Sequence, residues 1–368
     1  MLQRVIINGF KSIKTMDIEL RPLNILIGAN GAGKSNLISF FKMLNEMMAG
    51  RLQQYIGISG YAQSLLHFGA KITPQIEAKL EFEFHDAPYA YNLRLFHAAG
   101  DTLIFAEETL SLEEATFWEN RFLPGTKDSL GAGHQETKIS AAAHGGMQTS
   151  QVIEFLLNRC RVYHFHDTSS TAAVRQSCYV DDNRWLMPDA GNLAALLLRF
   201  REDHSTAYQR IVKTIRLIAP FFDDFVLVRR GHHVILNWLH KESDQVFGPH
   251  QFSDGTLRAI CLTTLLLQPE DELPALIIVD EPELGLHPYA LNVVAAMFGK
   301  ASYHTQILIS TQSTSFLDNF NPEDVITVDR VGKESQFKRL HPEELESWLE
   351  EYSLGEIWEK NIIGGSPH

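Results

Sequence analysis

Residues 28–35 read Gly-Ala-Asn-Gly-Ala-Gly-Lys-Ser and satisfy the pattern GxxxxGK[ST] at every fixed position. Glycine lets the backbone turn its N–H groups inward around phosphate oxygens, because no Cβ stands in the way. Lys34 supplies a positive charge for the β- and γ-phosphates, and Ser35 supplies a hydroxyl that can bind Mg²⁺. The segment therefore predicts a phosphate-binding loop for a nucleoside triphosphate rather than a chance glycine-rich turn.

A second group of residues places two carboxylates at the end of an apolar segment. Residues 276–279 read Leu-Ile-Ile-Val and are followed by Asp280 and Glu281. Ligands of α/β sheets bind at the carboxyl ends of the strands, so both carboxylates can reach the phosphate site. We expect Asp280 to hold Mg²⁺ through water, and Glu281 to be the general base that orients or deprotonates the attacking water. Taken alone, the segment is also compatible with a solvated acidic turn.

A third group consists of Ser253 and Gly255, within the string Phe-Ser-Asp-Gly-Thr-Leu-Arg at residues 252–258. The string opens a predicted helix, whose first N–H groups lack partners and carry the positive end of the helix dipole. A serine and a glycine at that point form a second anion-binding site. Ser-Asp-Gly is also a common helix cap and turn, so its meaning depends on the other two groups.

The elements that position these groups follow from the apolar pattern. Residues 23–27, 276–279 and 307–309 are continuous apolar runs, which are typical of buried parallel strands. Helices are predicted at residues 34–49 and 290–298 from their apolar spacing. The order strand, glycine loop, helix and then β-α-β predicts an α/β fold, a P-loop NTPase with a mainly parallel core sheet.

The remaining segments predict an antiparallel β-subdomain and an inserted helical lobe. Apolar residues alternate with polar ones between residues 80 and 112, which indicates an antiparallel meander. Residues 124–150 are rich in Gly, Ala, Ser and Thr, and we expect a mobile loop or a short insertion there. We also expect strands at 5–7, 16–20 and 162–165, helices at 152–161, 192–200, 208–218 and 256–267, and a hairpin that pairs 225–228 with 234–238.

Composition limits the partners of the chain. Its 368 residues include 45 Asp and Glu against 32 Lys and Arg, a net charge of −13. DNA is possible as a partner but is not indicated by this charge, since phosphates are held mainly by Lys and Arg; a local basic patch would still allow it. The three cysteines form no CxxC pair, which favours a reducing, cytoplasmic setting. We expect no signal peptide and no membrane span.

The three groups together resemble the ABC-type ATPase heads of the SMC, RecF and OLD group. Residues 6–14 resemble its FKS start, and the glycine loop followed by Asn36 matches its GxNGxGKSN form. Residues 253–255 stand at its signature motif, and Asp-Glu-Pro-Glu at 280–283 matches its Walker B form. The chain is most similar to stand-alone bacterial AAA_21-like ATPases without a nuclease domain, which share strings like residues 164–168 and 355–361. The resemblance covers both ends well and the middle poorly.

The resemblance implies a site for ATP and Mg²⁺ that two chains share. The phosphate loop and Glu281 of one chain would face the signature motif of another, so that ATP joins a homodimer or a higher homo-oligomer. The nucleotide-binding residues that it implies are Asn30, Gly31, Gly33, Lys34, Ser35, Asn36, Ser253 and Gly255. Ser35 and Asp280 would hold the metal, and Lys34 and Glu281 would act in catalysis.

One position departs from the pattern of these heads. Residues 310–313 follow the last core strand, where such heads usually carry a histidine, and this chain has Gln312. An amide can donate a hydrogen bond to the γ-phosphate but cannot become positively charged. We therefore assign Gln312 a catalytic role and expect slow or conditional hydrolysis. The sequence does not single out the Q-loop glutamine.

We expect one ATPase head over residues 1–368. Residues 1–166 and 250–340 would form the nucleotide-binding core with its β-subdomain, and residues 167–249 the helical lobe associated with the signature. Residues 341–368 would form a C-terminal tail. An acidic helix is expected at 343–351, either packed on its own core or docking a partner through Trp348 and Trp358.

Two further groups have open alternatives. His164 and His166 share one face of a predicted strand and can ligate a metal, but they fit better as residues that line the sheet end or pack structurally. Glu283 either lines a subunit interface near the nucleotide or has a plain surface or capping role.

Three functions remain compatible with these features. The first is an ATP-gated switch in bacterial genome defence that controls a separate effector protein, such as a nuclease; it rests on the resemblance and on the expected lack of a nuclease domain. The second is a RecF-like DNA-repair ATPase, which needs Arg4, Lys11, Lys14 and Lys71 to converge into a basic surface. The third is a transporter ATPase subunit, which the long middle region and the FKS-type start disfavour.

Overall fold

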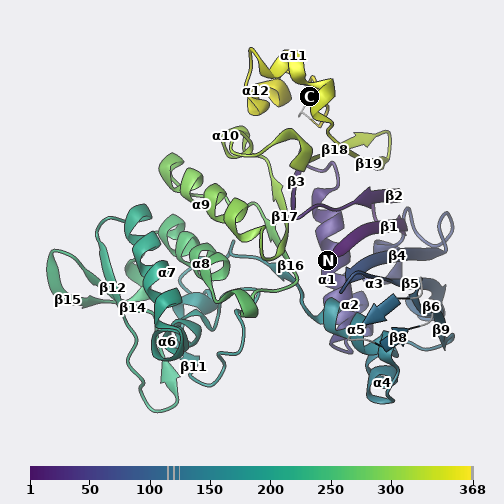
Figure 1. The fold of residues 1–368 in the computed structure, drawn as a ribbon, viewed down its shortest axis with the longest axis horizontal. Helices are drawn as coiled ribbons and strands as arrows, with labels where there is room; N and C mark the ends of the chain where they lie inside the picture. Colours follow the sequence, from purple (N-terminus) through teal and green to yellow (C-terminus); the bar gives the residue numbers. More distant parts are fainter. Residues whose placement is uncertain (114–115, 119–120, 124, 366–368) are drawn as a thin grey trace.

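The computed structural model describes residues 1–113, 116–118, 121–123 and 125–365 and consists of two sheets with helices around them (Figure 1). The core sheet has the order β10-β16-β17-β3-β18-β19, and its first five strands are parallel. The strands are β10 (Cys160–Tyr163), β16 (Leu276–Asp280), β17 (Gln306–Thr311), β3 (Leu23–Ile27), β18 (Val325–Val331) and β19 (Glu334–Arg339). The predicted α/β class with a mainly parallel core sheet is confirmed.

Both faces of the core sheet are covered, which explains why its strands read as continuous apolar runs. On β3, Ile25 and Ile27 face the helical lobe, whereas Leu26 faces the antiparallel sheet. On β16, Ile277 faces the helical lobe and Ile278 faces the antiparallel sheet. The alternation gives the molecule two hydrophobic cores, one on each side of the sheet that carries the site.

The second sheet is antiparallel, with the order β2-β1-β4-β5-β6-β9, as the alternating pattern predicts. One face packs on α1 (Lys34–Met48), α2 (Leu52–Ile58) and α5 (Gln148–Asn158), and short α3 (Tyr61–Leu65) lies beside them. The strands are β1 (Leu2–Phe10), β2 (Ile13–Glu19), β4 (Gln75–Phe84), β5 (Ala87–Ala98), β6 (Thr102–Leu112) and β9 (Thr126–Gly131).

The helical lobe lies on the opposite side of the core sheet (Figure 1). It contains α6 (Leu193–Asp203) and α7 (Ser205–Ile218), which pack with α8 (Asp254–Leu267) and α9 (Pro288–Ala301). Its small sheets pair β12 (Phe222–Val226), β14 (Asn237–His240) and β15 (Ser243–Phe247), and β11 (Cys178–Tyr179) with β13 (His233–Val234). The lobe holds the predicted signature helix, α8, against the core.

Of the two predictions for residues 124–150, the mobile loop is wrong where the structure describes the segment, and the short insertion remains compatible with it; residue 124 lies outside the described part. The segment contains β9, α4 (Ile139–His144) and the start of α5. Glu108 anchors it, because this fully buried carboxylate accepts hydrogen bonds from Tyr91 Oη at 2.9 Å and Lys138 N at 3.0 Å and pairs with His134 Nε2 at 2.8 Å. A buried polar anchor of this kind leaves no apolar pattern in the sequence.

Two smaller predictions are confirmed only in part. The hairpin forms between β12 and β14, with Phe225 opposite Trp238, while His233 and Val234 leave it to pair with β11. The strand expected at 162–165 ends at Tyr163, so His164 and His166 lie in the loop that follows β10. In both cases the apolar pattern predicts that a strand forms but not where it ends, because the ends depend on partners that are distant in the sequence.

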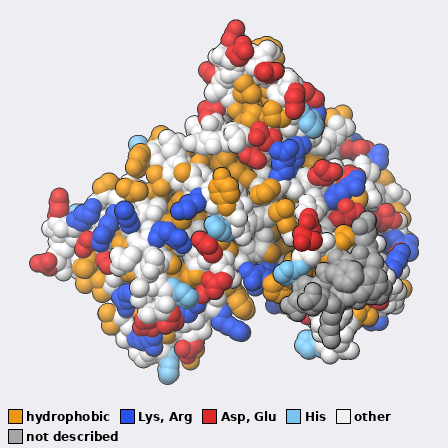
Figure 2. Space-filling model, viewed as in Figure 1, with side chains coloured by type: hydrophobic (Ala, Val, Ile, Leu, Met, Phe, Trp, Pro, Cys, Tyr) orange, Lys and Arg blue, Asp and Glu red, His pale blue; other side chains and the backbone are white. Residues whose placement is uncertain are grey.

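The C-terminal segment packs back on the core. The helix expected at 343–351 is a 3₁₀ turn (Pro342–Glu344) followed by short α11 (Glu346–Leu349). In α12 (Leu354–Glu359), Trp358 is buried, so it is no exposed anchor, whereas Trp348 is 41% exposed. Figure 2 shows acidic and apolar side chains together on the surface of this C-terminal segment, at the top of the view.

The end of the described chain reaches the phosphate loop. Gly365 has φ +72°, and a Cβ built on it would lie 3.4 Å from the Cα of Gly28.

No helix in the described part of the chain is long and apolar enough to cross a membrane.

Candidate functional site

The glycine loop lies between β3 and α1, as predicted, and it needs its glycines for two reasons. Gly31 and Gly33 have φ values of +78° and +123°, which L residues rarely adopt. A Cβ on Gly28 would lie 2.3 Å from Val328 O, and one on Gly33 would lie 2.0 Å from Ser335 Oγ. The loop is therefore held tightly against the β18–β19 hairpin.

Lys34 is almost fully buried, at 4% exposure, and its Nζ donates hydrogen bonds to Gly28 O and, at 3.3 Å, to Ala29 O. Burial lowers the pKa of the Lys34 ammonium, and the nearby carboxylates of Glu281, Asp280 and Glu283 counteract this shift. The amine of Lys34 thus lies within the glycine loop and close to three carboxylates. Such a site is suited to bind an anion that carries a metal ion.

Strand register brings the acidic residues to the same edge. Asp280 pairs with Ser310 of β17, and Ser310 pairs with Leu26 of β3. Neighbouring strands lie about 4.8 Å apart, so Asp280 is roughly 10 Å from the strand that enters the glycine loop. The glycine loop and the carboxylates therefore lie at the same carboxyl edge of the sheet, which is where ligands of α/β sheets bind.

Glu281 has an unusual backbone at the end of β16. Its φ of +43° lies in the left-handed region, which a non-glycine residue occupies only when its surroundings hold it there. Its N–H donates to Ser310 O at 2.7 Å, and its Oε1 accepts a hydrogen bond from the Gln312 side-chain amide. The structure thus places the two predicted catalytic side chains of Glu281 and Gln312 in direct contact.

Glu283 lies in the same network and is neither a surface residue nor a helix cap, since His287 caps α9. Its Oε1 accepts hydrogen bonds from Thr311 Oγ1 at 2.6 Å and Gln312 N at 3.1 Å. Burial raises the pKa of its carboxyl group. Glu283 therefore fixes the backbone on which Gln312 is carried.

Three buried polar atoms at this edge have no hydrogen-bond partner among the residues that the structure describes: Glu283 Oε2, Ser310 Oγ and His164 Nε2. Buried polar groups in native proteins are nearly always paired with protein, water or a ligand. Ser35 adds an exposed hydroxyl at the first turn of α1. These groups fit a hydrated cation and its phosphates, which the fold class implies.

The other predicted loop residues take different positions. Asn30 and Gly31 are exposed, and Gly31 O accepts a hydrogen bond from Arg330 at 3.1 Å. The Asn36 amide donates to Ser12 Oγ at 2.6 Å, and Ser12 in turn contacts Ser335 Oγ at 2.6 Å. Asn36 therefore braces the loop from behind, and a nucleotide contact for it stays a prediction.

The signature residues lie at the start of α8. Ser253 is its exposed N-cap, and its Oγ accepts a hydrogen bond from Thr256 N at 3.2 Å. Gly255 is packed so closely that a Cβ on it would lie 2.1 Å from Gly285 O. Within the described residues, neither Ser253 nor Gly255 makes a hydrogen bond to the phosphate loop of its own chain.

His164 and His166 adjoin the site without gathering a metal cluster. His166 Nε2 lies 2.8 Å from Asp280 O, and burial, Lys42 and His166 lower the pKa of His164 to about 4. No group of three or more His, Cys, Asp or Glu side chains that could hold a metal occurs in the described part of the chain. The pair therefore lines the sheet end.

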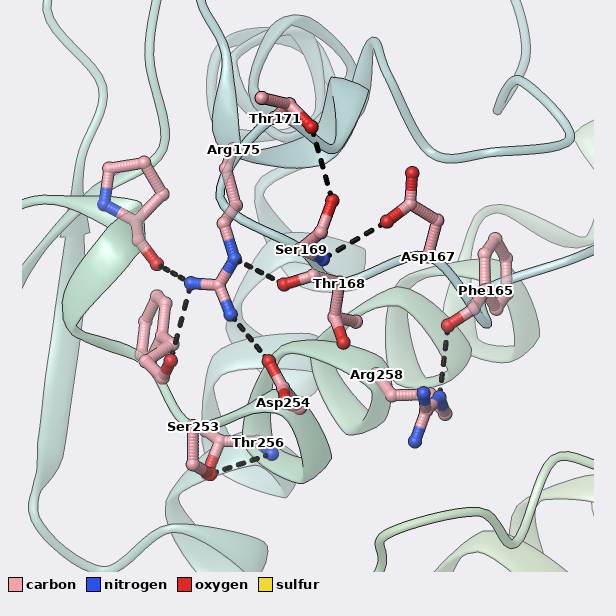
Figure 3. Close-up of polar contacts among 12 residues, drawn as sticks. Phe165, Asp167, Thr168, Ser169, Thr171, Arg175, Ser253, Asp254, Thr256 and Arg258 are labelled. Atoms are coloured by element: carbon pink, nitrogen blue, oxygen red, sulfur yellow. Dashed lines mark hydrogen bonds and ion pairs between the residues drawn. The ribbon is translucent and has the colours of Figure 1, made fainter.

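Two arginines that the sequence analysis did not assign complete the surroundings of α8. Arg175 and Arg258 are buried, and both donate to backbone carbonyls near the signature (Figure 3). A signal was available for Arg258, since a charge within the apolar sequence of α8 must find internal partners. No such signal marks Arg175.

This fold, with a glycine-lysine loop facing an acidic strand end and a separate signature helix, defines an ABC-type ATPase head of the SMC and RecF group. The chain belongs to the AAA_21 family, because the family model described as "AAA domain, putative AbiEii toxin, Type IV TA system" matches residues 23–318. Membership makes it an ATPase-type, nucleotide-binding protein. No curated protein matches the chain.

Solved structures of Smc heads share the fold. A head in the "Crystal structure of the SmcHead bound to the C-winged helix domain of ScpA" has a TM-score of 0.64 at 14% identity, over 94% of this chain and 99% of that one. An Smc head with an extended coiled coil, bound to the C-terminal domain of ScpA from Pyrococcus furiosus, has a TM-score of 0.60 at 13% identity, over 95% and 98%. The predicted fold and class are confirmed.

Proposed function

We propose that the chain is an ATP-driven switch in which two copies enclose two ATP molecules between the phosphate loop of one and the signature helix of the other. One observation carries this proposal. Lys34 and the three carboxylates lie at the carboxyl edge of the core sheet, whereas Ser253 is exposed and, among the described residues, its side chain bonds only to Thr256 of its own helix. A γ-phosphate at Lys34 therefore lacks the second anion site until another chain supplies it.

The residues of the first chain have distinct tasks. Lys34 binds the phosphates through charge, while the loop N–H groups and the start of α1 orient them. Ser35 and Asp280 are placed to hold Mg²⁺, which supplies neutralising charge when bound. Glu281 orients and deprotonates the attacking water, and Gln312 donates its amide to the γ-phosphate.

A separate effector protein under the control of this switch agrees with the comparisons. The family description names a toxin of a type IV toxin–antitoxin system, which supports a role in bacterial genome defence. The two Smc heads are described in complex with another protein, ScpA. We therefore propose that ATP-joined copies present a surface that a partner effector reads, in a cytoplasmic setting.

Direct DNA binding of the RecF type receives less support. Arg4 pairs with Asp17 at 2.6 Å and Lys14 pairs with Glu334 at 2.8 Å, so each cation is already neutralised. Lys11 is half-buried, and burial lowers its pKa. On the face drawn in Figure 2, basic and acidic side chains are interspersed. Tight, salt-dependent DNA binding by the purified chain would favour this alternative.

A mixing experiment tests the two-chain site. The Lys34→Ala chain lacks a working loop, and the Ser253→Arg chain cannot cover the loop of its partner because the arginine fills the gap. Neither variant alone can form a complete site. A mixed dimer has one complete site, built from the loop of the Ser253→Arg chain and the signature of the Lys34→Ala chain. Random mixing of equal amounts makes about half of the dimers mixed, and one of the two sites in each is complete, so about a quarter of all sites are restored.

ATP hydrolysis is measured for each variant and for their mixture. We expect two inactive preparations and an active mixture. An active Ser253→Arg protein on its own, or a mixture as inactive as its components, would refute the shared site. Lys213→Ala, a substitution on the exposed face of α7, is the matched control and should behave as the wild type.

A further inference from the structure

The loop after β10 connects the nucleotide edge with the signature helix through its backbone. Residues 164–168 leave the core sheet beside β16 and pass alongside the start of α8 (Figure 3). The carbonyl groups of Phe165, His166 and Thr168 each accept a hydrogen bond from a buried arginine. The loop therefore acts as a fixed template, and the turn that Asp167 Oδ1 makes with Ser169 N at 3.0 Å holds its shape.

Arg258, one turn into α8, makes three backbone contacts. Its Nε donates to Phe165 O at 2.9 Å, its Nη2 donates to His166 O at 3.2 Å, and its Nη1 donates to Leu284 O in the loop after β16. The side chain is 7% exposed. A planar guanidinium can satisfy acceptors in several directions at once, which a lysine ammonium cannot reproduce.

Arg175 holds the first turn of α8 from the other side. Its Nε donates to Thr168 O at 2.8 Å, its Nη1 donates to Phe252 O at 3.2 Å, and its Nη2 pairs with Asp254 Oδ1 at 2.8 Å. The side chain of Arg175 is 5% exposed and that of Asp254 is 67% exposed. The ion pair neutralises a carboxylate that stands beside Ser253, where an incoming triphosphate would otherwise be repelled.

The same loop is bound to the catalytic edge. His166 Nε2 lies within hydrogen-bond distance of Asp280 O, at 2.8 Å, and the backbone of Gly285 packs against Gly255. Asp280 and Ser253 are thus connected through His166, Arg258 and the loop after β16. If the end of β16 that carries Asp280 moves, α8 must move with it, or several of these hydrogen bonds break.

We propose that Arg258 and Arg175 are positioning residues that set Ser253 and Gly255 for the ATP bound to a second copy of this chain, while leaving the nucleotide of their own chain unaffected. The proposal rests on the shared site proposed above. It adds a direction: the two arginines act on the site that their own signature completes in the other chain, and not on the site of their own phosphate loop.

The direction can be tested with mixed dimers of Arg258→Ala. In a mixture with Lys34→Ala, the loop of the Arg258→Ala chain is covered by an intact signature, so hydrolysis should recover. In a mixture with Ser253→Arg, the intact loop is covered only by the displaced signature of the Arg258→Ala chain, so hydrolysis should stay low. The affinity of Arg258→Ala for ATP should remain within about twofold of the wild type.

The opposite pattern overturns the inference. Recovery with Ser253→Arg but not with Lys34→Ala would show that Arg258 acts on the nucleotide of its own chain. Recovery with neither partner, together with normal ATP affinity, would contradict it as well. If Arg258→Ala does not fold, Arg175→Lys replaces it in the same two mixtures, with the same expected pattern and the same contradicting one.

The mixture of Lys34→Ala with Ser253→Arg separates the two proposals. If that mixture fails to recover, the shared site itself is wrong. If it recovers while the arginine variants do not follow the expected pattern, only the positioning role is wrong. Asp254→Asn serves as a milder probe, because it removes the charge and keeps an acceptor for Arg175; it should lower hydrolysis less than Arg175→Ala does.

Discussion

The phosphate loop and the signature start are both helix N-termini suited to anions, yet they are built in opposite ways. At the loop, Lys34 is buried with carboxylates around it, and the glycines have left-handed backbones that are packed from behind. At the signature, Ser253 is exposed, its neighbour Asp254 carries a negative charge, and Arg175 binds that charge. The phosphate loop has a lysine that can bind a triphosphate, whereas the described residues place no unpaired cation at the signature.

This difference teaches that each edge is specialised. The phosphate-loop edge carries the residues that bind ATP and cleave it. The signature edge carries the residues that position the signature helix and close the ATP site of another chain. Substitutions at the first should change affinity or chemistry in their own chain, and substitutions at the second should act on another chain.

The largest effect is expected at Glu281. Glu281→Gln removes the general base but keeps the shape of the side chain and its contact with Gln312, so hydrolysis should fall by about 100-fold or more while ATP still binds. Steady-state ATPase assays and nucleotide titration measure the two quantities. Normal turnover by this variant would show that another group activates the water.

Lys34→Ala should come next. Losing a charge-assisted contact to the phosphates should weaken ATP binding by about 100-fold, equivalent to about 2.7 kcal/mol. Titration with a fluorescent ATP analogue measures the change, and Lys213→Ala is the control of the same residue type. An unchanged affinity would contradict the assignment of the phosphate loop.

Gln312 should have an intermediate effect. Gln312→Ala removes the amide that contacts Glu281, and hydrolysis should fall by about tenfold with little change in ATP affinity. Gln312→His should raise hydrolysis above the wild-type rate at pH values where the imidazole is protonated. A Gln312→His protein whose rate does not depend on pH would argue against a direct role at the γ-phosphate.

The smallest effect concerns stability. The pKa of His164 is lowered to about 4 in the fold, so the unfolded chain takes up a proton below about pH 6.5 that the folded chain refuses until about pH 4. The wild type should therefore lose stability between pH 7 and pH 5, and His164→Asn should lose about 1 kcal/mol less after allowance for solvent screening. Urea unfolding at the two pH values measures this, with His341→Asn, an exposed position, as control. Equal losses in the two proteins would exclude His164 as the cause.

Much of this architecture could be predicted from local pattern. The buried strands, the glycine loop and α8 follow from apolar periodicity and from residues with strict backbone demands. Glu108 anchors residues 125–150 by accepting hydrogen bonds from side chains and from Lys138 N, and Arg175 and Arg258 donate to backbone carbonyls far away in the sequence. A backbone N–H or carbonyl group has no residue type, so the sequence does not show which backbone group each of these side chains binds.

The roles of neighbouring polar residues were also beyond the sequence. Asn36 contacts Ser12, because the β1–β2 turn lies behind the loop, and its expected contact with the nucleotide stays a prediction. Glu283 had two open roles: its contacts with Thr311 and Gln312 of its own chain exclude the surface and capping role, and a place at a subunit interface stays a prediction. Both outcomes depend on how separate elements pack.

The most direct test of the shared site is the molar mass of Glu281→Gln in solution with Mg²⁺ and ATP, measured by light scattering. Two copies held by uncleaved ATP should give twice the 41.6 kDa of one chain, and ADP should give the single-chain mass. A species of 41.6 kDa saturated with ATP would contradict the account.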